Sequence, residues 1–360
     1  MKILLLADSN SSHTIKWVKA LSAKGIQIFI FGLQSLQHKD FEELPNVRCY
    51  SLNTKLNKKE GTLSKLSYLQ ALPSIKKLIK EVNPDIVHAH YASSYGLLGA
   101  LCGFKPYVLS VWGSDVFSFP KKSFLHKILL KYNLNQADAL LSTSETMALE
   151  SKKYTEKEIH ITPFGVDLHK FSMKSEEGNK RIIGTVKSLE HKYGIDILIK
   201  AFALLRSEFE NVELHIVGDG SDKENLLALT NTLGLADYVK FFGKISNDQV
   251  PEFLHSFSIY AALSRCEESF GVAIVEAQAC GTPVVVSRMG GLTEVVADTK
   301  TGLVVSNENI EEASAAFRLL LGDDALRKKL ALAARANVEA KYSWQKNVGA
   351  MVKIYEKLIS

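Results

Sequence analysis

Short runs of aliphatic and β-branched residues alternate along the chain with longer segments whose apolar positions recur every three or four residues. The short runs predict buried strands, and the longer segments predict amphipathic helices. A polar stretch at 172–180 has the composition of a linker and divides this alternation into two halves. We expect strands at 2–7, 26–31, 85–89, 107–111 and 139–143 before it, and at 181–186, 213–217, 239–242, 259–263 and 283–287 after it.

Strands that alternate with helices are typical of parallel sheets covered by helices on both faces. We therefore expect an α/β protein with two doubly wound, Rossmann-like domains in tandem. The two halves share no short sequence repeat, so they are alike in architecture only. Open α/β sheets bind ligands beyond the carboxyl ends of their strands. Two such sheets that face each other would enclose a central cleft, and the loops after the strands should carry the chemistry.

Length and composition narrow the class of protein. The chain has 360 residues, of which 46% are hydrophobic and 23% charged, which fits two ordinary domains and excludes disordered and collagen-like proteins. Its longest apolar stretches fall short of the roughly 20 residues that a membrane-spanning helix needs, and the first residues lack the pattern of a signal peptide. We therefore expect a cytoplasmic protein. The 4 cysteines form no C-x-x-C pair, so neither a zinc site nor a redox motif is expected.

The net charge of +5 is unevenly distributed. Residues 1–170 contain 22 Lys and Arg against 14 Asp and Glu, a balance of +8, while residues 171–360 contain 22 against 25, a balance of −3. Two basic stretches, 55–80 and 117–134, interleave lysines with leucines, isoleucines or phenylalanines. The basic first half could bind an anionic membrane surface or a phosphorylated substrate, although its charge could also serve solubility alone. Arg48 is the one arginine of this half, so we expect no nucleic-acid partner.

Several nucleotide-binding and hydrolytic motifs are missing. The loop after the first predicted strand lacks the G-x-G-x-x-G that lets a pyrophosphate approach the backbone, and so does the start of the second half. The chain also lacks G-x-x-x-x-G-K-[ST] and G-x-S-x-G. NAD-dependent chemistry, P-loop nucleotide hydrolysis and α/β-hydrolase activity are therefore not expected.

The segment 259–302 carries the strongest chemical signal. A predicted strand leads into a loop with Glu268, and Gly271 then opens a helical pattern that contains Glu276. A glycine at a helix start lets a ligand approach the free N–H groups, and the helix dipole favours an anion such as a diphosphate. The two carboxylates are eight positions apart and could hold the hydroxyls of a sugar and a ribose. The alternative is one capping Glu and one ordinary helical Glu.

The sequence E-S-F-G-V-A-I-V-E-A at 268–277, continuing to the G-G at 290–291 and the T-G at 301–302, resembles the E-x7-E region of glycosyltransferase family 4. Further motifs similar to those of the family occur at 85–91, 110–115 and 163–167. The first loop, D-S-N-S-S-H-T-I-K-W, resembles that of members that build bacterial surface polysaccharides. The resemblance spans nearly the whole chain and implies the GT-B fold and transfer with retention of anomeric configuration.

The resemblance also implies a set of donor-binding residues. Lys187 and Lys192 stand where the family has an Arg and a Lys against the donor diphosphate, and Lys187 departs from the pattern because it offers a point charge in place of a bidentate fork. Glu268 would hold the transferred sugar, and Glu276 would hold the ribose. Expected neighbours of the donor are the backbone N–H groups of Phe270, Gly271 and Val272 and, around the base, Gly218 and Ile245 with Asp219, Gly220 and Lys244 beside them.

On the acceptor side, His90 matches the family histidine near the transferred sugar. His88 lies two positions earlier and would share a strand face with it, so the assignment between the two stays open. Asp115, which follows an exposed-looking Trp112, would orient the acceptor hydroxyl or else cap a helix. His13, in the first loop, is a further acceptor-side candidate. His90, Glu268 and Lys192 are the expected catalytic residues.

The family pattern assigns residues 1–170 to acceptor binding and 171–344 to donor binding, with a closing helix at 345–360 that returns to the first domain. The implied substrates are a nucleotide diphosphate sugar, with a UDP-sugar as the first expectation, and a glycan or lipid-linked acceptor of lipopolysaccharide or capsule synthesis. The implied location is the cytoplasm, with peripheral contact at the inner face of the membrane. No metal or other cofactor is expected, because the chain has no Asp-x-Asp and lysines would replace the cation. The alternatives are a nucleotide-sugar epimerase of the same fold and a non-catalytic sugar-nucleotide-binding protein.

Overall fold

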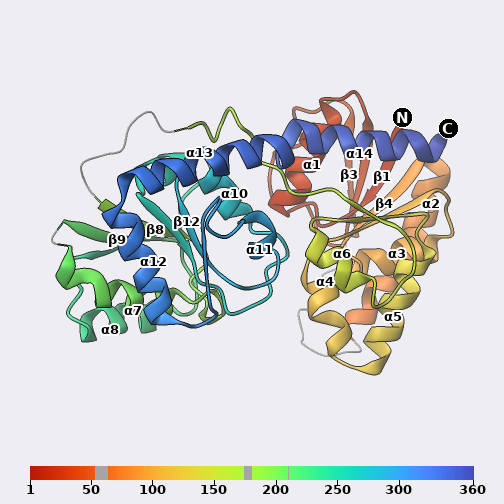
Figure 1. Cartoon of the computed structure of the whole chain (residues 1–360). Coiled ribbons are helices and arrows are strands. Elements are labelled where there is room, and N and C mark those ends of the chain that lie inside the picture. Colours follow the sequence, from red (N-terminus) through yellow and green to blue (C-terminus); the bar gives the residue numbers. More distant parts are fainter. Residues whose placement is uncertain (53–63, 174–180, 210) are drawn as a thin grey trace. The chain divides into compact units, whose positions relative to one another are not determined.

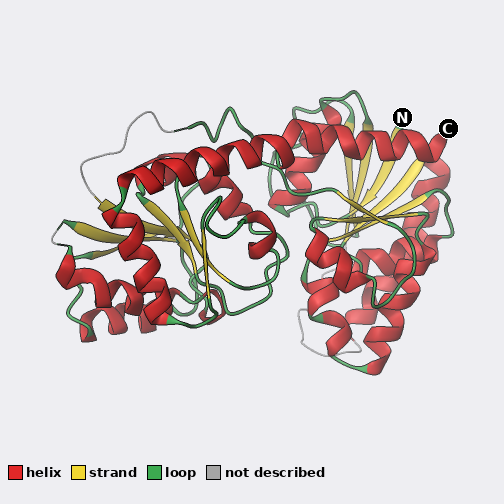
Figure 2. Cartoon of the chain, viewed as in Figure 1, coloured by secondary structure: helices red, strands yellow, loops and turns green. Residues whose placement is uncertain are grey.

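The computed structural model describes residues 1–52, 64–173, 181–209 and 211–360. The chain divides into two compact units: unit 1 consists of Met1–Pro163 with Asn347–Ser360, and unit 2 of Phe164–Lys346. In each unit helices surround a central sheet (Figure 2). Most of the predicted linker at 172–180, and residues 55–63 of the first basic stretch, lie outside the described residues.

The sheet of unit 1 is parallel throughout, with the strand order β3-β2-β1-β4-β5-β6-β7. Strands β1, β3 and β4 of this sheet are labelled in Figure 1. Its strands are β1 (Lys2–Leu6), β2 (Gln27–Gly32), β3 (Val47–Ser51), β4 (Ile86–His90), β5 (Tyr107–Val111), β6 (Ala139–Ser142) and β7 (Ile159–Ile161). Its helices are α1 (Ser12–Ser22), α2 (Leu72–Val82), α3 (Ser94–Cys102), α4 (Ser114–Phe117), α5 (Phe124–Gln136), α6 (Glu145–Ser151), the 3-10 turns η1 (Ser64–Ala71) and η2 (Phe119–Lys121), and the part of α14 (Trp344–Ile359) from Asn347 onward.

Unit 2 repeats the architecture with the strand order β10-β9-β8-β11-β12-β13, again parallel. Its strands are β8 (Arg181–Val186), β9 (Val212–Val217), β10 (Val239–Gly243), β11 (Ile259–Ala262), β12 (Val284–Ser287) and β13 (Leu303–Val305). Its helices are α7 (Ile195–Leu205), α8 (Lys223–Thr232), α9 (Val250–Ser256), α10 (Val272–Ala279), α11 (Leu292–Val295), α12 (Ile310–Gly322) and α13 (Asp324–Lys341), with the 3-10 turns η3 (His191–Tyr193) and η4 (Arg206–Glu208).

The central strands explain why the apolar runs are continuous instead of alternating. Every residue of β4, β5, β6, β11 and β12 is buried, as expected for strands covered by helices on both faces. Each unit has its own hydrophobic core. The predicted α/β class with two doubly wound domains is confirmed.

All ten predicted strands are present, and their ends differ from the predicted ones by one residue at most. Three further strands, β3, β7 and β13, were not predicted from the sequence, and all three are edge strands of their sheets. Among the described residues, no helix is both long and apolar enough to cross a bilayer.

Candidate active site

The carboxyl edge of the unit 2 sheet brings together two of the predicted donor-binding residues. Lys187 follows β8 and Glu268 lies in the loop after β11, the strand that pairs with β8. Lys187 Nζ donates to both carboxylate oxygens of Glu268, each at 2.7 Å, and the two side chains are only 20% and 11% exposed. Ser264 Oγ donates to the same carboxylate. The predicted phosphate-binding and sugar-binding groups are therefore in direct contact.

Lys192 lies on η3 beside Lys187. Its ammonium pairs with Glu190 Oε2 at 2.7 Å, and this hydrogen bond raises the pKa of Lys192. The Lys187 and Lys192 ammonium groups lie 4.4 and 4.9 Å from the centroid of the Tyr193 ring, within cation–π distance. The Tyr193 ring thus lies within cation–π distance of two ammonium groups, and each of these also pairs with a carboxylate.

The N-terminus of α10 lies in the same loop region. Gly271 is its N-cap, with φ +96° and no capping side chain, and the first bond within the helix runs from Ile274 N–H to Gly271 O at 3.0 Å. The N–H of Val272 precedes that bond, as the first N–H groups of a helix do. The ring of Phe270 is buried, 5.3 Å from the Tyr342 ring, so a ligand could contact this residue only through its backbone. Glu276 is half-buried on the helix.

Glycines let the backbones of the loops that carry Lys187 and Glu268 pack closely against neighbouring segments. A Cβ added to Gly290 would lie 2.6 Å from Glu268 O, and the N–H of Gly291 donates to the same oxygen at 2.7 Å. A Cβ on Gly218 would lie 1.9 Å from Lys187 O, so Gly218 serves close packing against the Lys187 backbone. Ile245 is half-buried in the loop after β10. The predicted roles of Gly218 and Ile245 at the nucleotide base stay predictions.

In unit 1, His88 has a structural environment. It is fully buried in β4, with Nδ1 hydrogen-bonded to Tyr355 Oη at 2.7 Å and Nε2 hydrogen-bonded to Ser110 Oγ at 2.8 Å. Burial lowers the pKa of His88 to about 3. Because both ring nitrogens are engaged, His88 joins α14 to the sheet and has no nitrogen left for a ligand.

His90, at the end of β4, differs from His88. Its Nδ1 is buried and has no hydrogen-bond partner among the described residues, and its ring lies 4.4 Å from that of Trp112. Burial, followed by the neighbouring His88 and His13, holds the pKa of His90 well below its usual value. The ring is therefore neutral, and the geometry favours His90 over His88 as the histidine available to a ligand.

Two further acceptor-side candidates surround Trp112. The His13 ring lies 6.0 Å from it, and burial, with a smaller effect from Lys16, lowers the pKa of His13 to about 4. Trp112 itself is half-buried between these rings, not exposed as the sequence suggested. Asp115 is fully buried, and its carboxylate accepts backbone N–H groups from Ala92, Trp112 and Gly113 at 2.7 to 3.3 Å.

Burial raises the pKa of Asp115, and its backbone hydrogen bonds oppose that shift. These contacts show Asp115 holding together the loops after β4 and β5. Its predicted action on an acceptor hydroxyl stays a prediction.

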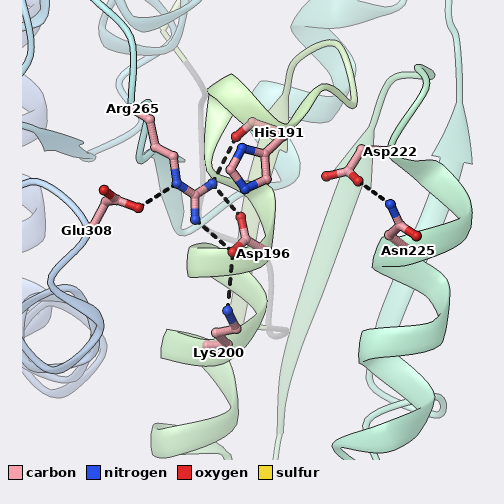
Figure 3. A network of polar contacts seen from close by, with 7 residues as sticks. All are labelled: His191, Asp196, Lys200, Asp222, Asn225, Arg265 and Glu308. Atoms are coloured by element: carbon pink, nitrogen blue, oxygen red, sulfur yellow. Dashed lines mark hydrogen bonds and ion pairs between the residues drawn. The ribbon is translucent and has the colours of Figure 1, made fainter.

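Sequence reasoning assigned no role to Tyr193, Tyr355 or Arg265. Tyr193 directly follows the predicted donor-binding residue Lys192 in the sequence. Arg265 and its partner Asp196 (Figure 3) are 69 positions apart, and no local pattern joins them. Among the described residues, no group of three or more His, Cys, Asp and Glu side chains is arranged to hold a metal ion.

Two family models match the chain. Residues 169–337 match the glycosyl transferases group 1, and residues 2–144 match the glycosyl transferase 4-like family. The chain belongs to glycosyltransferase family 4. The first match includes all the donor-side candidates of this glycosyltransferase, and the second includes His13, His90 and Asp115.

Known proteins similar to this glycosyltransferase include an uncharacterized glycosyltransferase of Methanocaldococcus jannaschii, 28% identical over 96% of this chain and 93% of that protein. A D-inositol 3-phosphate glycosyltransferase of Corynebacterium jeikeium is 28% identical over 77% of this chain and 73% of that protein. The crystal structure of Anabaena HepE in complex with UDP is similar with a TM-score of 0.84 at 20% identity, covering 99% of this chain and 100% of that one. The last likeness confirms the GT-B fold.

Proposed function

We propose that this glycosyltransferase moves a hexosyl group, with retention, from a nucleoside diphosphate sugar to a glycan or lipid-linked acceptor. The observation that carries the proposal is the gathering of Lys187, Lys192 and Glu268 at one sheet edge, around the Tyr193 ring. Two ammonium groups near a helix N-terminus suit a diphosphate. A UDP-sugar is the first candidate, because HepE, which has the same fold, was crystallised with UDP.

In the proposed reaction the bond between the sugar C1 and the leaving phosphate oxygen breaks while the acceptor oxygen bonds C1 from the same face. The leaving phosphate takes the proton of the acceptor hydroxyl. Lys187, Lys192 and the N-terminus of α10 stabilise the charge that develops on the diphosphate, which is the largest catalytic contribution. Glu268 orients the sugar, and the neutral His90 ring lies on the acceptor side. We propose that the step needs no divalent cation, because the lysines and the helix supply the positive charge.

The acceptor in this proposal belongs to surface-polysaccharide synthesis and is held at a membrane. The support is an exposed apolar face on α5, where Phe124 and Leu125 are each 75% exposed and Ile128 is 48% exposed. Residues spaced three and four apart share one helix face. Exposed lysines adjoin it, as in helices that lie on anionic bilayers. These lysines are Lys121, Lys122, Lys127 and Lys131.

The first experiment screens UDP-, GDP- and ADP-sugars for thermal stabilisation and then measures transfer of the stabilising sugar to lipid-linked acceptors. We expect one nucleotide to raise the melting temperature and transfer to proceed in the presence of EDTA. Glu268→Gln should lower kcat by about 10- to 100-fold, because a charge-assisted hydrogen bond contributes about 1.5–3 kcal/mol. Near wild-type turnover of this variant would contradict the role of Glu268, and donor consumption without an acceptor would favour an epimerase.

The second experiment measures co-sedimentation with vesicles of phosphatidylcholine, with and without phosphatidylglycerol. Phe124→Ser/Leu125→Ser and Lys121→Glu/Lys122→Glu should each abolish binding to the anionic vesicles. The matched control is Lys328→Glu/Lys329→Glu on α13, where Leu332 is 63% exposed beside lysines that are also exposed. Equal binding by all three variants would contradict the membrane role of α5.

A further inference from the structure

Arg265 lies three residues before Glu268, in the loop after β11, and is at the centre of a network of polar contacts (Figure 3). Its Nη1 and Nη2 donate to the two carboxylate oxygens of Asp196 at 2.7 and 2.8 Å, a bidentate fork, and its Nε donates to Glu308 at 2.6 Å. Nη1 also donates to His191 O at 2.8 Å. The side chain is 16% exposed. A planar guanidinium fits this set of acceptors, whereas a lysine ammonium does not.

These contacts fix the turn that carries Lys192. The guanidinium of Arg265 donates to His191 O, the carbonyl of the residue before Lys192. The backbone N–H of Arg265 donates to Lys192 O at 2.8 Å. On the other side of the turn, a Cβ added to Gly194 would lie 2.0 Å from Leu263 O. The η3 backbone is therefore held against the loop after β11 at consecutive positions, while the Lys192 side chain itself is half exposed.

The same loop also determines where Glu268 lies. Ser264, next to Arg265, donates its hydroxyl hydrogen bond to Glu268, and Ser264 O accepts a hydrogen bond from Ser287 Oγ at 2.7 Å. Arg265 thus stands between the segment that holds Glu268 and Lys187 together and the segment that carries Lys192 and Tyr193.

The charge of Arg265 is already matched. Two carboxylates, Asp196 and Glu308, receive its donors, and Asp196 also pairs with Lys200 at 3.2 Å. Burial acts to raise the pKa of Asp196, but its hydrogen bonds and ion pairs with Arg265 and Lys200 outweigh burial and lower it to about 2. A guanidinium engaged in this way stabilises neighbouring backbone and is not a free cation for a phosphate.

We propose that Arg265 is a positioning residue of the donor site: it holds η3 so that Lys192 meets the donor diphosphate, without touching the donor itself. The inference rests on the proposed binding of a nucleoside diphosphate sugar. It predicts that loss of the fork weakens recognition of the diphosphate and leaves recognition of the nucleoside unchanged.

The test is titration calorimetry of Arg265→Lys with UDP and with uridine, together with steady-state kinetics. We expect UDP affinity to fall by about tenfold, because a misplaced ammonium loses much of its contact with the phosphate. Uridine affinity should stay within about twofold of wild type, and the KM for the donor should rise. The control is Arg318→Lys, which breaks an equally bidentate but exposed fork to Glu208 in the same unit, with bonds of 2.6 and 2.7 Å, and should change neither affinity.

Unchanged UDP affinity in Arg265→Lys, or equal losses for UDP and uridine, would overturn the inference. If Arg265→Lys does not fold, Glu308→Gln weakens only the exposed arm of the network, because it removes the negative charge of that acceptor, and should weaken UDP binding by a smaller factor, again without effect on uridine. No effect of Glu308→Gln on UDP binding would then overturn it. If the wild-type protein binds inorganic diphosphate but no nucleoside diphosphate, the proposed function is wrong. The same variants titrated with inorganic diphosphate then still decide the role of Arg265.

Discussion

The two sheets have the same strand order, apart from the additional strand β7 of unit 1, but different kinds of side chain lie at their carboxyl edges. In unit 1 the candidate groups are neutral imidazoles packed against one another and against Trp112, together with the buried Asp115, whose carboxylate accepts backbone N–H groups. In unit 2 they are ammonium groups and carboxylates, paired with each other and partly exposed. A buried imidazole stays neutral because protonating it away from water is costly, whereas an ion pair near the surface exchanges partners readily. Unit 1 is therefore preorganised, whereas in the proposed reaction the diphosphate would displace carboxylates from the lysines of unit 2.

The largest expected effect that separates the two units is acid sensitivity. The pKa values of His13 and His88, about 4 and about 3, lie below the ordinary value of 6.5, so the unfolded chain takes up protons first as the pH falls. The stability that these neutral rings contribute is complete above pH 6.5 and is lost as the pH falls toward their folded pKa values. Between pH 7 and 5 each ring should cost unit 1 about 2 kcal/mol.

Urea unfolding of a Trp344→Phe variant, followed by the fluorescence of Trp17 and Trp112, measures unit 1 in this pH range. The Arg265–Asp196 pair should persist over the same range, because the carboxylate of Asp196 stays ionised down to a pKa of about 2. Equal stability of unit 1 at pH 7 and pH 5 would contradict the description of its edge as a cluster of neutral rings.

The next largest effect should come from the charges of unit 2. Lys187→Ala removes the cation that, in the proposed reaction, stabilises the leaving diphosphate, and kcat/KM should fall by about 100- to 1,000-fold in steady-state transfer assays. Lys240→Ala is the matched control, because Lys240 also pairs with a carboxylate of this unit, Glu213, at 2.7 Å but lies on the edge strand β10. Similar losses in both variants would mean that general electrostatics, and not the place of Lys187, supports catalysis.

The sequence was informative wherever burial produced continuous apolar runs. Every interior strand of both sheets was predicted, whereas β3, β7 and β13 were not. Edge strands are covered less completely and need fewer apolar residues: in β3 only Val47 is buried, and in β7 no residue is fully buried. The patterns of β3 and β7 therefore differ little from that of a loop. Burial does not explain why β13 was missed, since two of its three residues are buried, nor why the edge strand β10, with one buried residue, was predicted.

The candidate site shows the same limit. Single positions such as Lys187 and Glu268 were predicted from motifs, but their contact spans 81 positions and depends on the pairing of β8 with β11. The sequence also left the choice between His88 and His90 open, because one of the two hydrogen-bond partners of His88 is Tyr355, 267 positions away. Motifs identify residue types along the chain, and packing decides which nitrogen or carboxylate is already engaged.

That engagement of His88 gives a third prediction, smaller than the first two. Tyr355→Phe removes the hydroxyl that is hydrogen-bonded to Nδ1 of the fully buried His88. An unsatisfied buried polar atom costs about 1–3 kcal/mol, so unit 1 should lose that much in urea unfolding at pH 7. Tyr132→Phe on α5, where the ring is 39% exposed, should lose less than about 0.5 kcal/mol. Equal changes in the two variants would show that the hydroxyl of Tyr355 contributes nothing specific.

The smallest expected effect tests whether the donor edge of unit 2 depends on close packing as the buried edge of unit 1 does. Gly290 has φ +49°, and a Cβ there would lie 2.6 Å from Glu268 O and 2.9 Å from Glu268 N. Gly234 has a similar φ of +68° but nothing within 4 Å of its Cβ position. At either site the left-handed backbone alone should make alanine cost roughly 1 kcal/mol of stability. Only Gly290→Ala must also push the Glu268 loop aside, so its kcat should fall by about tenfold while that of Gly234→Ala stays at the wild-type value. If both variants keep full activity, the Glu268 loop tolerates displacement, and the donor edge is adaptable where the buried edge of unit 1 is not.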